Sequence, residues 1–113
     1  MCTCYIVHSY GLHNDLTLSW AALYTGDFEA ALWHAEAPER WRCKRSFFDW
    51  LLVFMDGMVA IPWHVLIRFG RWHDILARPL PKDTGRFRVS TATAHYAKGI
   101  AFAVLGNIEE VCT

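Results

Sequence analysis

Apolar positions along the chain recur at intervals of three and four residues, the spacing that places side chains on one face of an α-helix. Leu18, Ala21, Ala22 and Leu23 follow this spacing within residues 14–24. Apolar segments bounded by glycine, proline or capping residues predict further helices at 28–37, 46–58, 60–69, 71–77 and 92–105. No stretch alternates cleanly between apolar and polar residues as a half-buried strand would. We therefore expect an all-α fold.

Several residues mark the ends of these predicted helices. Asp27 is placed to cap the helix that starts at residue 28, because its carboxylate accepts from backbone N–H groups of the first turn. Pro38 lacks an amide hydrogen and is expected to end or kink that helix. Ser46 is expected to cap the helix over 46–58, and Ser90 or Thr91 the last one. Residues 79–85 form the one clear loop.

The most apolar stretch, residues 47–67, is long enough to suggest a membrane span. It contains Asp49, Asp56 and Pro62, which would leave charges and freed carbonyl groups in hydrocarbon. Two shorter helices that meet near Gly57 fit this stretch better. We expect no stable membrane insertion.

Three glycine turns resemble one another. Gly26, Gly70 and Gly106 are each followed by a polar residue, a large apolar residue, two mostly polar residues and a small or aliphatic one. Glycine supplies the left-handed conformation that ends a helix, and Phe28 and Trp72 would fill the turns. The turns are 44 and 36 residues apart, from 26 to 70 and from 70 to 106. A period of this size is typical of stacked helical repeats.

The unit that ends at Gly106 resembles the tetratricopeptide repeat, a helix–turn–helix motif of about 34 residues. Gly99 stands at the family's small residue, Phe102 at its aromatic residue and Gly106 at its turn glycine. In the first unit, Leu18-Ser19 replaces the family's leucine-glycine pair, Ala22 replaces the aromatic residue, and Ala31 stands at the small residue of the second helix. The second unit departs further, with Pro62-Trp63 at the leucine-glycine position.

The resemblance implies a right-handed α-solenoid in a single domain over 1–113, with units at about 10–42, 46–81 and 90–113, the last one incomplete. Looser similarity, in residues 10–14, 68–72 and 95–99, links the chain to long, mostly uncharacterised tetratricopeptide proteins of bacteria and protists. The chain then resembles an internal piece of a longer array. Uncapped ends of such arrays favour self-association.

Composition narrows the function classes. Hydrophobic residues form 54% of the 113 residues, which excludes a disordered tail. Eleven Lys and Arg balance eleven Asp and Glu, so no net positive charge favours nucleic acid. The four cysteines, Cys2, Cys4, Cys43 and Cys112, form no dense disulfide framework, and no export signal is evident. A cytoplasmic protein with reduced thiols is expected.

Candidate catalytic and metal-binding residues form no known motif. Cys2, Cys4, His8 and His13 are ligand types, but the one-residue gap between the cysteines does not suit a zinc site. There is neither a serine elbow nor a glycine-rich phosphate loop. We expect a protein that is not an enzyme and uses no metal or cofactor, and a Cys–His enzyme built on repeats is the last-ranked alternative.

The resemblance implies that the first helices of the units line a concave groove. Side chains at matching phases of these helices would point into it: Trp20, Tyr24, His64, Arg68 and Tyr96. Aromatic residues and arginine are common anchors in protein interfaces. The predicted function is a scaffold that binds a peptide or helix of a partner protein. Packing of Trp20 and Tyr96 against a neighbouring helix is the open alternative.

A second function class uses another part of the chain. Arg40, Arg42, Lys44 and Arg45 surround Trp41, and an apolar segment follows at 47–59. These segments could place a helical protein on a membrane surface. Surface ion pairs with Glu36 and Glu39 are the simpler interpretation of the basic cluster.

Overall fold

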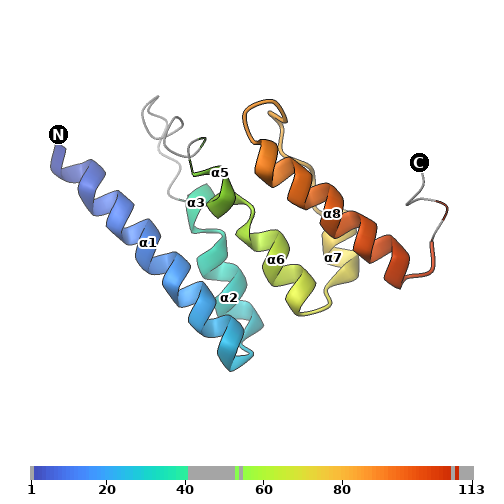
Figure 1. Cartoon of the computed structure of the whole chain (residues 1–113). Coiled ribbons are helices and arrows are strands. Elements are labelled where there is room, and N and C mark those ends of the chain that lie inside the picture. Colours follow the sequence, from blue (N-terminus) through green and yellow to red (C-terminus); the bar gives the residue numbers. More distant parts are fainter. Residues whose placement is uncertain (1, 41–52, 54, 108, 110–113) are drawn as a thin grey trace.

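The computed structural model describes residues 2–40, 53, 55–107 and 109, with side chains from residue 9 onward. The part that it describes is helical and contains no strand, which confirms the all-α prediction. The helices, labelled as in Figure 1, are α1 (Cys2–Thr25), α2 (Phe28–Ala35), α3 (Ala37–Arg40), α5 (Asp56–Val59), α6 (Ile61–Arg68), α7 (Trp72–Ala77) and α8 (Arg88–Val104).

The helices form two layers. Figure 1 shows α1, α6 and α8 side by side in front, with α2 and α7 behind them. Helix α1 packs on α2, α2 on α6, and α6 on both α7 and α8, so contacts follow the order of the chain. The molecule measures 52 × 35 × 16 Å, a thin slab two helices deep.

The three predicted glycine turns have one geometry. Gly26, Gly70 and Gly106 have φ of 79°, 64° and 81°, in the left-handed region that favours glycine. In each turn the N–H of the next residue donates to the carbonyl five residues earlier, which satisfies an end carbonyl of the helix. The pairs are Asp27 to Ala22 at 3.0 Å, Arg71 to Leu66 at 2.9 Å and Asn107 to Phe102 at 2.9 Å.

The first two turns also contact each other. The rings of Phe28 and Phe69 meet edge to face, with 5.3 Å between centroids. The guanidinium of Arg71 lies 4.2 Å from the centroid of the Phe28 ring. The large apolar residue predicted to fill the first turn therefore also joins it to the second.

Helix α2 begins at the predicted residue but ends two residues before the predicted end at 37. The Asp27 side chain accepts a hydrogen bond of 3.0 Å from the N–H of Ala30, which confirms the predicted cap. Helix α2 ends at Ala35, and Pro38 lies in the first turn of the short α3. The Ser19 hydroxyl donates to the carbonyl of Ala31 at 2.8 Å, so a small residue allows α1 and α2 to approach closely.

Trp63 is buried in the larger of two hydrophobic clusters, with 3% of its surface exposed. In the predicted repeat register it corresponds to Ser19. Three alanines of α8 belong to the same cluster: Ala94, Ala97 and Ala101. Small side chains on α8 leave the volume that the indole fills. The second cluster joins Ala22, Ala31, Ala35 and Val65 at the junction of α1, α2 and α6.

Two predicted helix starts were wrong. Helix α1 begins at Cys2 instead of near residue 14, and α8 begins at Arg88 instead of Ala92. Neither Ser90 nor Thr91 caps α8. The Asp56 carboxylate, from α5, accepts from the N–H groups of Val89 at 2.6 Å and Ser90 at 3.1 Å.

The predicted helix boundary near Gly57 was also wrong. Gly57 lies inside α5, and α5 gives way to α6 at Ala60. Pro62 lies in the first turn of α6, where a missing N–H leaves no hydrogen bond unmade. Most of the helix predicted over 46–58, together with its Ser46 cap, lies outside the described residues.

Candidate functional site

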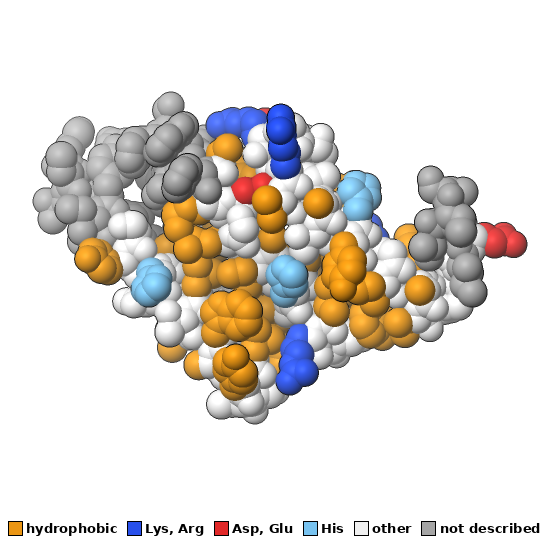
Figure 2. Space-filling model, viewed as in Figure 1, with side chains coloured by type: hydrophobic (Ala, Val, Ile, Leu, Met, Phe, Trp, Pro, Cys, Tyr) orange, Lys and Arg blue, Asp and Glu red, His pale blue; other side chains and the backbone are white. Residues whose placement is uncertain are grey.

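The front layer carries exposed aromatic side chains. Trp20 and Tyr24 lie one turn apart on α1 and are 49% and 85% exposed, and Tyr96 on α8 is 62% exposed. His64 and Arg68 lie one turn apart on α6 and are also exposed. We call these five side chains the α1–α6–α8 face. Figure 2, viewed as Figure 1, shows hydrophobic side chains gathered over α1, α6 and α8, with His and Lys or Arg among them.

The buried side of each helix explains this exposure. Ser19 and Ala22 direct α1 toward α2. On α6, Trp63 and Leu66 pack on one side and Val65 on the other, which leaves His64 and Arg68 facing away from both clusters. The residues predicted for the groove are therefore all on the surface, and Trp20 is the least exposed of the three aromatic rings.

The five side chains make no polar or ring contact among the described residues. None of them forms a hydrogen bond, ion pair or ring contact with another described side chain, and none belongs to either hydrophobic cluster. Exposed large apolar side chains are typical of interaction sites when they gather on one face.

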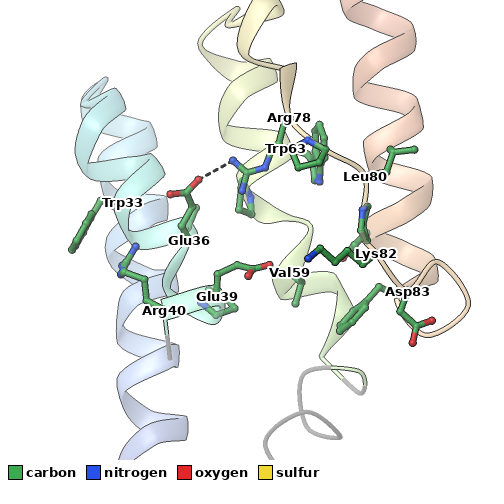
Figure 3. Close-up of a pocket in the computed structure, with 17 residues that line it drawn as sticks. Trp33, Glu36, Glu39, Arg40, Val59, Trp63, Arg78, Leu80, Lys82 and Asp83 are labelled. Carbon is green, nitrogen blue, oxygen red and sulfur yellow. Dashed lines mark hydrogen bonds and ion pairs between the residues drawn. The ribbon is translucent and has the colours of Figure 1, made fainter. Parts of the chain in front are cut away.

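A cavity of about 700 Å³ lies elsewhere, between α2 and α3 on one side and the segment after α7 on the other (Figure 3). None of the five face residues lines it. Its walls combine aromatic rings, prolines and charged groups, including Trp33, Glu36, Trp63, Arg78 and Lys82. Sequence reasoning missed this cavity, although all four prolines of the chain line it: Pro38, Pro62, Pro79 and Pro81.

One ion pair joins charged groups of the cavity, and two of its arginines lie over aromatic rings. Arg78 and Glu36 form an ion pair of 2.8 Å across it, drawn in Figure 3. Arg78 also lies 5.7 Å from the Trp63 ring centroid, and the Arg40 guanidinium lies 3.9 Å from that of Trp33. These contacts hold the walls together, so the arrangement has a structural explanation.

Two further polar contacts join helices. The His34 ring nitrogen lies 2.7 Å from the Asp15 carboxylate and links α2 to α1. Lys98 of α8 donates to the carbonyl of Leu76 in α7 at 2.9 Å. Partial burial lowers the pKa of Lys98 by desolvating its ammonium group. Both contacts secure packing between neighbouring helices.

The other sequence candidates fall largely outside the described residues. Of the basic cluster, Arg40 alone is described, and the apolar segment 47–59 is described at 53 and from 55 onward. Side chains of Cys2, Cys4 and His8 are likewise not described. Within the described ranges, no group of three or more His, Cys, Asp or Glu side chains lies together. No helix there is both long and apolar enough to cross a bilayer.

Comparisons of the chain with protein-family models, curated proteins and solved structures found no match. The geometry of the α1–α6–α8 face and of the cavity is therefore the basis for a functional proposal.

Proposed function

We propose that the chain is a non-enzymatic protein-interaction module that binds a peptide or helix of a partner protein on the α1–α6–α8 face. One observation carries the proposal: five large or charged side chains from three helices are exposed and make no hydrogen bond, ion pair or ring contact with a described side chain. Tryptophan, tyrosine and arginine are the residues that most often dominate binding energy in protein interfaces. Rigid helices would present these side chains with little loss of conformational freedom.

The proposal includes a finer description of the fold, a right-handed α-solenoid of tetratricopeptide-like units. The shared geometry of the glycine turns supports it. Positions that follow the first two turns also correspond, since Ala31 and Ile75, each five residues after its glycine, are both fully buried. In a solenoid each unit packs on its neighbours and leaves an extended surface for partners.

The α1–α6–α8 face is a better candidate than the cavity for this function. In the cavity, Arg78 contacts Glu36 and Trp63, and Arg40 contacts Trp33. A ligand there would have to replace these contacts. On the face, Arg68 and the aromatic rings have no described partner to displace, so a partner would bury them without such a loss.

A peptide library displayed on phage, selected against the immobilised full chain, tests the proposal. Selected peptides should lose at least about tenfold in affinity for the Trp20→Ala/Tyr24→Ala variant, because two anchors are gone. Trp33→Ala is the matched control, since Trp33 is 60% exposed but lies on α2 in the other layer. It should bind the same peptides as the parent chain does.

Circular dichroism and thermal unfolding of the double variant must accompany the binding measurement. Both replaced side chains are exposed, so helix content and the unfolding midpoint should change little. Equal loss of binding in both variants, or unfolding of the double variant, would contradict the assignment of the face.

A further inference from the structure

The two helical layers differ in charge, although the whole chain is neutral. Of the nine Asp and Glu residues that the structure describes, Asp15 is the one found in α1, α6 or α8. The other eight lie on α2, α3, α5 or α7 or in the segments that follow a helix. The front layer contains Arg68, Arg88 and Lys98. Its formal charge is therefore positive.

Asp15 does not lower the charge of the α1–α6–α8 face directly. Its carboxylate lies 2.7 Å from His34 of α2, and this contact directs it toward the other layer. The nearest buried positions of α1, Leu12 and Leu16, lie on the same side of the helix. The five residues of the face are thus three aromatic rings, a histidine and an arginine, with no carboxylate among them.

Arg68 is the cation of this layer that the fold leaves unused. Lys98 donates to the carbonyl of Leu76, and the Nε of Arg88 donates to the carbonyl of Gly85 at 3.2 Å. Arg68 forms no hydrogen bond, ion pair or ring contact with a described residue. It lies one turn from His64, and both are exposed.

We infer that the partner segment of the α1–α6–α8 face is acidic: a peptide or helix that carries Asp or Glu beside aromatic or aliphatic side chains. The inference rests on the proposed function and specifies the chemistry of its partner. The planar guanidinium of Arg68 donates two parallel hydrogen bonds to a carboxylate, and the rings of Trp20, Tyr24 and Tyr96 cover its apolar neighbours. Complementary charge would also select against basic segments.

Three synthetic peptides test the inference. They share a fluorescein label, a length of about 12 residues and the same Leu and Phe positions, and carry only Glu, only Gln or only Lys at the remaining positions. Fluorescence anisotropy with the full chain should give the order Glu, Gln, Lys in decreasing affinity, with about tenfold between the first and the last. Added salt should weaken the Glu peptide most.

Variants locate the preference. Arg68→Gln should reduce the advantage of the Glu peptide over the Gln peptide severalfold, and Arg68→Lys should restore part of it. Arg86→Gln is the charge-matched control, because Arg86 is an exposed arginine in the segment before α8, near Asp83. It removes one positive charge from the chain and should leave the preference unchanged.

The outcomes separate the two proposals. Equal affinity for all three peptides, with loss on Trp20→Ala, would overturn the acidic partner while the binding face stands. Equal effects of Arg68→Gln and Arg86→Gln on the preference would also overturn the acidic partner. No saturable binding of any peptide up to about 1 mM would contradict both proposals. Light scattering at the same concentrations measures the oligomeric state of the chain. A dimer that forms through the α1–α6–α8 face would make a second copy its occupant and would also overturn the inference.

Discussion

The carboxylate of Asp56 in α5 accepts a hydrogen bond of 2.6 Å from the backbone N–H of Val89 in α8. It also accepts from the N–H and the hydroxyl of Ser90. A carboxylate from another helix therefore performs the task of an N-cap residue, and it is favoured there by the positive end of the α8 dipole. Asp56 is 7% exposed, so these bonds are made with little competition from water.

Asp56→Ala should lower the free energy of unfolding by about 2 to 4 kcal/mol, because the variant loses the cap and leaves buried donors without an acceptor. Urea unfolding followed by circular dichroism at 222 nm measures the change. Ser90→Ala keeps both backbone bonds to Asp56 and should cost about 1 kcal/mol. Equal losses in the two variants would contradict a capping role for Asp56.

Asp27 caps α2 in a different environment, since its side chain is exposed. Asp27→Ala should cost about 1 kcal/mol, and Asp27→Asn, which keeps an acceptor for the N–H of Ala30, should cost less. The same urea titration gives both values. A loss for Asp27→Ala as large as that for Asp56→Ala would show that burial does not set the strength of these caps.

Gly26 and Gly99 form a matched pair for the turn geometry. A Cβ at either position would meet no atom within 4 Å, but Gly26 has φ of 79° and Gly99 lies within α8. Gly26→Ala should destabilise the chain by about 1 to 2 kcal/mol because of its left-handed backbone. Gly99→Ala should stabilise it by about 0.5 to 1 kcal/mol through better helix formation. The midpoints of thermal unfolding of the two variants should shift in opposite directions. Shifts in the same direction would contradict the different backbone conformations of Gly26 and Gly99.

Trp63 and Trp33 differ in burial, at 3% and 60% exposed. Trp63→Ala leaves a void beside the alanines of α8 and should cost about 3 to 5 kcal/mol. Trp33→Ala loses the stacked Arg40 and should cost less than about 1 kcal/mol. Denaturant titration of both variants measures the difference, and a small effect of Trp63→Ala would show that α8 closes over the void.

The fold was predictable where local chemistry decides it. The turn glycines and the Asp27 cap form their hydrogen bonds with residues close to them in the sequence. The glycines at 26, 70 and 106 and the cap all have the predicted geometry. The start of α8 was not predictable, because its cap, Asp56, is more than 30 residues earlier in the chain. Its own Ser90 turns inward to Asp56 instead.

The same distinction holds for the surface. Matching positions in the predicted helices were enough to place five side chains on the surface: Trp20, Tyr24, His64, Arg68 and Tyr96. The cavity depends on three segments that meet only after folding, and its Arg78–Glu36 pair joins residues 42 positions apart. The fit of Trp63 likewise requires alanines from another helix, which no local pattern around Pro62-Trp63 indicates.

A slab 16 Å thick has a consequence for hydrogen exchange. No backbone amide in the described helices lies deeper than one helix from solvent, so protection depends on how many neighbours a helix has along the slab. Helix α6 contacts α2, α5, α7 and α8, more of the chain than either outer helix does. Its amides should exchange last, and protection should fall toward α1 and α8, so the molecule would open from its edges inward.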